Sequence, residues 1–447
     1  MLDWRDTQLA ELIEIKHGFA FKGEFFSDSP SHDILVTPGN FAVGGGFQLN
    51  KPKFYTGPVP EDYVLNAGDV IVTMTDLSKE ADTLGYSAIV PASKERFLHN
   101  QRIGKVIPKS EEVFLPFVAW VMRTIPYRNE IVGGATGSTV KHTSPSRILS
   151  HKFKLPAPLE QRAIASVLSA LDDKIELNRQ MNKTLEAMAR AIFKDWFVDF
   201  GPTRAKMEGR APYLAPDIWS LFPDRLDDEG KPEGWDSVCL GDLAEQIAMG
   251  PFGSNIKVET FVANGVPIIS GGHLRGMRLD DTSYNFVSAE HADRLGRSNV
   301  KRGDVVFTHA GNIGQVAIIS DTSRYDRYVL SQRQFYMRCN RDLISPMYVV
   351  HFFHTTEGQH ALLANASQVG VPSIARPATY LRSIKINRPP KTLLSAFDEN
   401  AGSLHLKAGL NLKENCTLVT TRDFLLPKLM AGKVRVKDAE KLVGEAT

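Results

Sequence analysis

One internal repeat constrains the fold of this 447-residue chain more than any other feature. Four short matches recur in the same order at an offset close to 231 residues. The matching pairs are Trp4 with Trp235, the strings AGDVIVT and RGDVVFT that begin at Ala67 and Arg302, the strings NQR at 100–102 and SQR at 331–333, and Pro158 with Pro389. Solenoid repeats are only about 20 to 50 residues long, so this repeat predicts two copies of one domain, each followed by one tail.

Each copy is predicted to mix short strands with helices, which gives an α+β (mixed) fold class. The β-branched runs bounded by Gly, Pro and Asp predict buried strands, and the apolar runs that begin at a proline predict helices. The expected strands are 35–37, 69–74, 87–90, 267–270, 304–308 and 315–320, and the expected helices are 116–124 and 346–355. The pattern does not determine the order of the strands. The loops at 18–26 and 73–85 differ from their counterparts at 250–258 and 308–314, as expected if the loops read different ligands.

Both tails show apolar residues at spacings of three and four, which predicts long helices. The first would run from Pro158 to Trp196, roughly 60 Å at 1.5 Å per residue. Gly402 and Gly409 weaken the second by about 1 kcal/mol each, so it needs a partner helix. We expect a pseudo-twofold, antiparallel, coiled-coil-like spacer in which a central Asn layer fixes the register. The expected contact residues are Ile164, Leu168, Leu171, Ile175, Asn178, Met181, Leu185, Met188, Ile192, Leu394, Phe397, Leu404, Asn411, Leu418, Leu425 and Leu429.

These patterns divide the chain into five segments. The repeated domains are 1–157 and 232–389, the long helical segments are 158–200 and 390–447, and a Pro- and Gly-rich linker at 201–231 connects the first tail to the second copy.

Composition excludes several classes of protein. The net charge is only +2, so DNA contact would have to come from local patches or partner subunits. Residues 275–341 carry eleven Arg and Lys against seven acids, which a solvated face would explain equally well. Cys239, Cys339 and Cys416 lie far apart, which argues against zinc sites and disulfides and favours a reducing cytoplasm. We find neither a membrane span nor a secretory signal in the sequence.

No motif in the chain predicts catalysis. The string Asn387-Arg388-Pro389-Pro390-Lys391 approaches an adenine-methyltransferase loop, but it lacks the aromatic that stacks a flipped base. Residues 133–138 (GGATGS) lack the Gly-Lys-Ser/Thr ending of a phosphate loop, and a backbone contact to DNA phosphate explains them better. No Cys or further acid completes a metal set with the histidine group, for which we predict a structural or helix-surface role. That group is His351, His354, Glu357 and His360.

Three strings are distinctive. Residues 155–209 resemble the central shared region of type I restriction–modification specificity subunits, PEGW at 232–235 with the following LGDLAE resembles the start of their second target-recognition domain, and 421–436 resembles their C-terminal tail. The shorter strings GFAFKG at 18–23 and GSTVKH at 137–142 resemble recurring target-domain loops. The resemblance covers essentially the whole chain.

The resemblance implies a non-catalytic, sequence-specific DNA-binding subunit. Each repeated domain would read one half of a bipartite, asymmetric DNA target, and the helices would fix the unread spacer and dock methyltransferase subunits that methylate adenine N6. Restriction/translocase subunits would add to that core. The resemblance places S-adenosylmethionine, ATP and magnesium on those partner subunits, none on this chain, and it implies no membrane partner.

Base readout needs polar side chains in loops, with Arg preferring guanine and Asn or Gln preferring adenine. The recurrence of Gln101–Arg102 as Gln332–Arg333 favours a shared structural or phosphate role for these two pairs. The candidate DNA contacts are Lys22, Thr75, Asp76, Gln101, Arg102, Ser138, Thr139, Lys141, His142, Ser254, Asn255, His273, Arg275, His309, Asn312, Gln332, Arg333, Gln368 and Ser373.

Three other functions fit parts of the sequence. The chain could be the specificity protein of a related system with fused nuclease and methylase, a duplicated protein-binding scaffold, or a stand-alone restriction–methylation enzyme without recognisable motifs. Methylation by the purified chain alone would identify the enzyme. A gel-shift series against salt would identify the scaffold, because phosphate contacts give a steep salt dependence.

Overall fold

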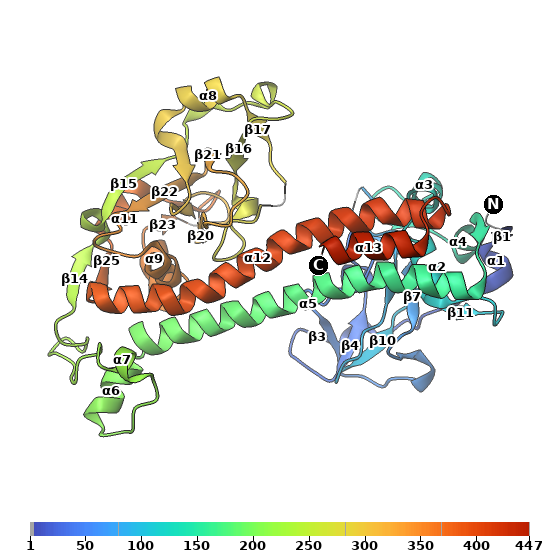
Figure 1. The fold of residues 1–447 in the computed structure, drawn as a ribbon, viewed down its shortest axis with the longest axis horizontal. Coiled ribbons are helices and arrows are strands. Elements are labelled where there is room, and N and C mark those ends of the chain that lie inside the picture. Colours follow the sequence, from blue (N-terminus) through green and yellow to red (C-terminus); the bar gives the residue numbers. More distant parts are fainter. Residues whose placement is uncertain (1–3, 79, 282, 368, 447) are drawn as a thin grey trace. The chain divides into compact units, whose positions relative to one another are not determined.

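The computed structural model describes residues 4–78, 80–281, 283–367 and 369–446 (Figure 1). They form two compact units, one made of Met1–Leu177 with Glu414–Thr447 and the other of Asn178–Lys413. We call these unit 1 and unit 2. The two longest helices, α5 (Pro158–Phe197) and α12 (Lys391–Met430), each contribute one end to each unit.

Unit 1 is built on two sheets, with strand orders β3-β5-β4-β10-β6 and β2-β11-β7-β9. Its strands are β1 Arg5–Gln8, β2 Ile13–His17, β3 Phe26–Ser27, β4 Asp33–Val36, β5 Lys53–Tyr55, β6 Val64–Leu65, β7 Val70–Thr73, β8 Thr75–Asp76, β9 Ser87–Ile89, β10 Arg96–His99, β11 Ile103–Pro108, β12 Lys141–His142 and β13 Lys152–Leu155. Its shorter helices are α1 Leu9–Leu12, α2 Leu115–Val121, α3 Ile125–Gly133, α4 Pro145–Leu149 and α13 Val436–Ala446.

Unit 2 also has two main sheets, with strand orders β15-β22-β19-β20 and β17-β16-β21-β18. Its strands are β14 Asp236–Cys239, β15 Ala244–Met249, β16 Val266–Ile269, β17 Phe286–Val287, β18 Asn299–Lys301, β19 Val305–Thr308, β20 Val316–Ile318, β21 Arg327–Leu330, β22 Gln334–Cys339, β23 Ala366–Ser367, β24 Ser373–Ile374 and β25 Lys385–Arg388. Its shorter helices are α6 Gly201–Met207, α7 Pro216–Trp219, α8 Ala289–Arg294, α9 Pro346–Phe353, α10 Thr356–Leu363 and α11 Pro377–Ser383.

The two units share one topology, which confirms the predicted internal repeat. The sheet order β2-β11-β7-β9 recurs as β15-β22-β19-β20, and the antiparallel pair of β1 with β13 recurs as β14 with β25. In the other sheet, the parallel pair of β4 with β10 recurs as β16 with β21. All six predicted strands and both predicted helices are present, with ends that differ from the prediction by up to three residues.

A pair of glycines explains one recurring part of the repeat. A Cβ atom on Gly18 would collide with the carbonyl oxygen of Asn100, and one on Gly250 would collide with that of Ser331. Only a residue without a side chain allows the backbone to approach this closely. Both units therefore hold the loop after their first long strand against the turn that contains the repeated Gln-Arg pair.

The long helices pack against each other and run antiparallel within each unit, as predicted. In unit 1, the Asp172 carboxylate pairs with Arg422 at 2.8 Å, and the Asn415 side chain donates to the Ile175 carbonyl at 3.4 Å. In unit 2, Asn182 donates to the Ala408 carbonyl at 3.0 Å and accepts from Asn411 at 2.9 Å. Along these contacts the residue numbers on α12 decrease as those on α5 increase, so the two helices run antiparallel.

One expected contact residue lies off the helix interface. Met188 is 49% exposed, whereas the next residue, Ala189, is fully buried. After Asn182 the buried face of α5 continues through Ala189 and Phe193, because here the helix packs against the aromatic side chains of α9 as well as α12. Met181, Leu185, Ile192 and Leu404 are partly buried, and the other expected contact residues are buried.

The segment 201–231 contains folded structure. It holds α6 and α7, and the Phe222 ring packs edge-on against Trp196 with centroids 5.3 Å apart.

Within the described ranges, no helix combines the length and apolar composition needed to cross a membrane.

Candidate nucleic-acid interface

Three loops converge in unit 1, and we call them loop cluster 1: the turn 100–102, residues 73–76 after β7, and the loop 136–143. Backbone hydrogen bonds hold them together. The Gln101 amide donates to the Phe19 carbonyl at 3.0 Å, Met74 donates to Arg102 at 3.0 Å, and Thr143 donates to Met74 at 3.0 Å. The loops are anchored by their main chain, so their side chains can vary without loss of these contacts.

Two of these anchors recur in unit 2, in loop cluster 2: the turn 331–333, residues 309–313 after β19, and residues 369–374. The His309 amide donates to the Arg333 carbonyl at 2.9 Å, and Ile374 donates to His309 at 2.8 Å. His309 therefore occupies the place of Met74. A further hydrogen bond from Gly311 to the Pro372 carbonyl at 2.9 Å ties the last two loops together.

The topology explains why these loops meet. The turn with the Gln-Arg pair joins β10 to β11 in unit 1 and β21 to β22 in unit 2, so it passes between the two sheets of its unit. The strands β7 and β19 pair with β11 and β22, and each ends beside that turn. The third loop precedes α4 in unit 1 and α11 in unit 2.

Most polar candidates of unit 1 face solvent. The repeated Gln-Arg pair is exposed, Lys141 is partly buried, and Lys22 is exposed beside Glu24 at 3.8 Å. The exposed candidates in loop cluster 1 are Gln101, Arg102, Ser138, Thr139 and His142. They present donors of several kinds on one group of loops, as DNA contacts require.

Thr75 and Asp76 are corrections to the expected DNA contacts, because both side chains are buried. The Asp76 carboxylate accepts hydrogen bonds from the Ser78 amide and the Thr83 hydroxyl, each at 2.7 Å. Burial alone would raise the pKa of Asp76, but the hydrogen bonds from Thr83 and Ser78 outweigh it and lower that pKa. The Thr75 hydroxyl is engaged with the His142 ring at 3.2 Å. Asp76 therefore organises the 76–83 loop from inside.

In unit 2 the exposed candidates are Asn255, Arg275, Asn312, Gln332 and Arg333. Ser373 is partly buried. Gln368 lies outside the described residues, and the side chain of Ser254 is not described.

His273 is a further correction. It is buried, its Nδ1 accepts from the Ser270 amide at 2.9 Å, and its Nε2 donates to the Ser283 carbonyl at 2.7 Å. The ring stacks on Tyr284 with centroids 4.4 Å apart. Both ring nitrogens make hydrogen bonds within the protein, so this histidine stabilises a turn and has no ring nitrogen left for a ligand.

His309 is partly buried and braces loop cluster 2. Its Nε2 donates to the Gln332 carbonyl at 3.1 Å. Burial lowers the pKa of His309 more than this hydrogen bond raises it, so the imidazole is neutral at pH 7. The Gln332 side chain donates in turn to the Gly253 carbonyl. The loop 250–255 is thereby attached to loop cluster 2.

Several exposed apolar side chains beside loop cluster 2 are not among the predicted contacts. Val369 is 90% exposed, and Val371 and Phe252 are also largely exposed. Apolar side chains read the thymine methyl group in the major groove. In the strings GPFG and GVP an apolar residue stands between turn-forming residues, and this pattern could have indicated an exposed apolar side chain.

Of the residues considered for metal binding, His351 and His354 lie inside the fold, whereas Glu357 and His360 are exposed on α10. His351 is buried, with its Nε2 at 2.8 Å from the Nε2 of His405, and His354 donates to the Val316 carbonyl at 2.8 Å. Among the residues whose placement is described, no group of three or more His, Cys, Asp or Glu is arranged to hold a metal ion.

Comparisons with known proteins agree with this architecture. Residues 1–187 match the family described as the type I restriction modification DNA specificity domain. The HindI specificity subunit of Haemophilus influenzae is 24% identical over 378 residues, which cover 74% of this chain and 80% of that protein. The MjaIX specificity subunit of Methanocaldococcus jannaschii is 25% identical over 370 residues, which cover 79% of this chain and 76% of the relative.

A solved structure shares the fold. The S subunit of a type I restriction–modification system from M. genitalium superposes with a TM-score of 0.55 at 14% identity, and the match covers 96% of each chain. The matched domain at residues 1–187, the two relatives and the repeated architecture make this chain similar to the specificity subunits of type I restriction–modification systems.

Proposed function

We propose that this chain is the DNA-recognition subunit of a type I restriction–modification complex, with one half of a bipartite target read by each loop cluster. One observation carries the proposal: two copies of one scaffold hold three loops at equivalent places, with two equivalent backbone hydrogen bonds in each unit, but present different side chains. A scaffold shared by the two units, with loops that differ between them, suits two domains that recognise different sequences on one DNA.

The exposed side chains differ as two half-sites of different sequence would require. Loop cluster 1 presents Ser138, Thr139 and His142, whereas loop cluster 2 presents Asn312 and the apolar Val369. The first set suits hydrogen bonding to base edges or phosphates, and the second adds contact with thymine methyl groups.

The arginines of the repeated pairs are assigned to the DNA backbone. Arg102 and Arg333 are exposed at equivalent places in both units. A contact that recurs in two readers of different sequences is best explained by what the two half-sites share, which is phosphate.

The roles of the partners follow from the proposed function. We expect α5 and α12 to set the number of unread bases between the half-sites and to dock the methyltransferase subunits. S-adenosylmethionine, ATP and magnesium then act on the methyltransferase and translocase subunits, and this chain supplies specificity. The complex would work in the cytoplasm, where its DNA is found.

A domain exchange tests the proposal. Residues 1–150 are replaced by those of a homologue with a different target, and methylated adenines are mapped in DNA from cells that also carry the partner subunits. We expect one half of the methylated sequence to change and the other half to stay.

The reciprocal exchange of residues 232–389 is the matched control, and it should change only the other half. A change in both halves from either exchange would contradict separate readers. Absence of sequence-dependent methylation with the unaltered chain would contradict the proposed function itself.

A further inference from the structure

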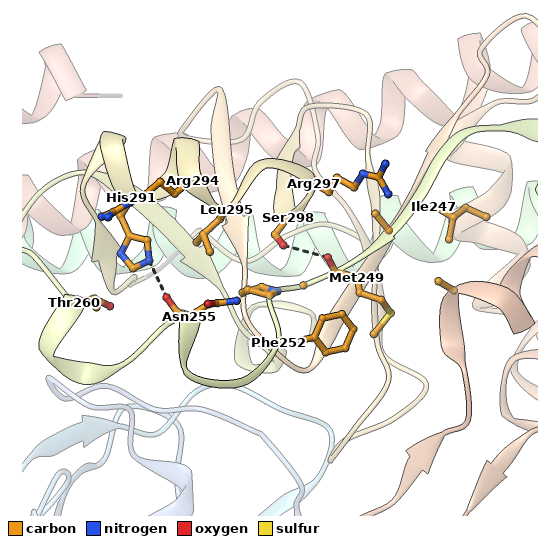
Figure 2. Close-up of a pocket in the computed structure, with 14 residues that line it drawn as sticks. Ile247, Met249, Phe252, Asn255, Thr260, His291, Arg294, Leu295, Arg297 and Ser298 are labelled. Carbon is orange, nitrogen blue, oxygen red and sulfur yellow. Dashed lines mark hydrogen bonds between the residues drawn. The ribbon is translucent and has the colours of Figure 1, made fainter.

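A pocket of about 770 Å³ opens beside loop cluster 2 (Figure 2). Its walls come from the end of β15, the loop 250–255, and the segment that runs from α8 through the short 3-10 helix Gly296–Ser298. Thr260, together with Ala378 on α11, completes the lining. The whole pocket belongs to unit 2.

Two arginines give the pocket a positive wall. Arg294 and Arg297 line it, and both are exposed. Within the described part of the chain, neither guanidinium has an ion pair or a hydrogen bond, and no acidic residue lines the pocket. The neighbouring Asp293 carboxylate forms an ion pair with Arg327 at 2.7 Å. Figure 2 shows both arginines on one side of the pocket.

An aromatic ring faces them. Phe252 is 73% exposed at the pocket mouth, and Figure 2 shows its ring on the other side from the arginines. The lining also includes the apolar residues Ile247, Met249 and Leu295. A cationic wall opposite an apolar face suits a ligand with an anionic part and a flat or apolar part.

The pocket is held open by hydrogen bonds between its walls. His291 Nε2 donates to the Asn255 carbonyl at 2.8 Å, and the Ser298 hydroxyl donates to the Met249 carbonyl at 3.2 Å (Figure 2). The Gln332 side chain binds the Gly253 carbonyl, so the same loop also belongs to loop cluster 2. A DNA strand that lies on loop cluster 2 therefore has this pocket as its immediate neighbour.

We propose that this pocket clamps the sugar–phosphate backbone of duplex DNA, with a phosphodiester on Arg294 and Arg297 and the adjoining sugar against Phe252. This inference rests on the proposed function. Guanidinium groups bind phosphate oxygens with two parallel hydrogen bonds. The contact fixes the register of the strand and carries no base preference, because every nucleotide presents the same phosphate and sugar.

The test measures salt dependence of DNA binding. The chain, purified with its co-expressed modification subunits, is titrated with a labelled 40-base-pair duplex at 50 to 200 mM NaCl. Each lost phosphate contact lowers the slope of log K against log salt by about 0.9. We expect R294A/R297A to lower the slope by about two and to weaken binding about tenfold or more at 50 mM salt. The preference between duplexes of different sequence should not change.

Three variants separate the contacts. K301A/R324A removes two exposed positive charges from unit 2 outside the pocket and should leave the slope nearly unchanged. R294K/R297K keeps the charges and should keep most of the slope. F252A should weaken binding with an unchanged slope, because it removes no charge.

Different failures have different meanings. Equal slopes for R294A/R297A, K301A/R324A and the unaltered complex would overturn the clamp while leaving DNA recognition intact. Competition by free nucleoside monophosphate or inorganic phosphate at submillimolar concentration would also overturn it, in favour of a small-molecule site. An unaltered complex that binds no duplex would overturn the proposed function together with the clamp.

Discussion

Asp172 joins three parts of unit 1 through two arginines. Its carboxylate binds Arg123 at 2.6 Å and Arg422 at 2.8 Å. Arg123 is nearly buried, stacks on the Trp120 ring at 3.8 Å and donates to the Gly44 carbonyl at 2.8 Å. This network links α5 and α12 to the α2 helix and to the glycine loop 44–46.

We expect D172A to lower the free energy of unfolding of unit 1 by about 3 kcal/mol, because a buried guanidinium that loses its partner keeps its desolvation cost. Urea unfolding followed by circular dichroism measures the change. R5A is the matched control: it breaks the Arg5–Glu112 pair, which is more than half exposed on both sides, and should cost under 1 kcal/mol. Similar losses for both variants would refute the network.

Two buried histidines make unit 2 sensitive to acid. His351 on α9 and His405 on α12 share one hydrogen bond, and neither Nδ1 has a partner among the described residues. Burial, together with the nearby charges of Arg278 and Arg190, lowers the pKa of His405 to about 4, and burial with Arg190 nearby lowers that of His351 well below its ordinary value. Both rings are therefore neutral in the folded protein at pH 7.

Above pH 6.5 these rings are neutral in the folded and unfolded states, so they do not affect stability. Below pH 6.5 the unfolded rings bind protons that the folded rings cannot, which costs about 1.4 kcal/mol per pH unit for each histidine. For His405 the loss continues to about pH 4 and totals about 3 kcal/mol.

Thermal unfolding between pH 7.5 and 4.5 should therefore show a smaller acid loss in H351L/H405L than in the unaltered chain. The exposed His360 provides the control variant H360N, which should follow the unaltered chain. The buried His99 of unit 1 titrates equally in all three proteins. Identical pH profiles would rule out the pair as the cause.

At the scale of elements, the sequence predicted what depends on local pattern. The β-branched run at Val70–Thr73 is a fully buried strand, and the apolar spacing from Ile164 to Ile175 is a helix face. The order of the strands could not be predicted, because the parallel pair of β4 with β10 joins residues about 60 positions apart. Such pairings depend on tertiary packing and not on the local sequence.

The candidate site was predicted less completely for two physical reasons. Thr75, Asp76 and His273 are of the types that contact DNA, but turns use the same donors and acceptors to satisfy their own backbone. Met188 has the spacing of a contact residue, but the buried face of α5 shifts by one residue where α9 adds its aromatic side chains. Neither effect appears in a pattern of residue types.

The shifted face gives a prediction for α5. A189L adds volume to a fully buried position and should lower the free energy of unfolding by about 1–3 kcal/mol. M188L changes a half-exposed position and should stay within about 0.5 kcal/mol. Urea denaturation of both variants measures the difference, and a larger loss for M188L would restore the original assignment.

At the scale of the whole molecule, both units depend on both long helices. Asn182 and Asn411 meet in unit 2, and Asn415 binds α5 in unit 1, so a polar layer marks the middle of each helix. Buried polar groups of this kind select one register of a helix pair. A change of helix length must therefore be made in both helices at once.

We expect four residues inserted in α5 after Asn178 and four in α12 before Asn415 to lengthen the unread spacer by one or two base pairs. One added turn is ~6 Å of helix, and DNA rises 3.4 Å per base pair. Mapping of methylated adenines measures the spacer. The same insertion in α5 alone should abolish methylation, because it breaks the Asn182–Asn411 register. An unchanged spacer in the double insertion would contradict the proposal that the two helices set the spacer length.

The main-chain anchoring of the loop clusters has a consequence for inheritance. The hydrogen bonds from Met74 and His309 to the Gln-Arg turns use only peptide groups, so these links between the loops do not depend on the side chains at either position. Recombination between the two halves of the gene could then move a reading surface from one half to the other without disturbing the core. New recognition sequences could arise from material that the gene already contains.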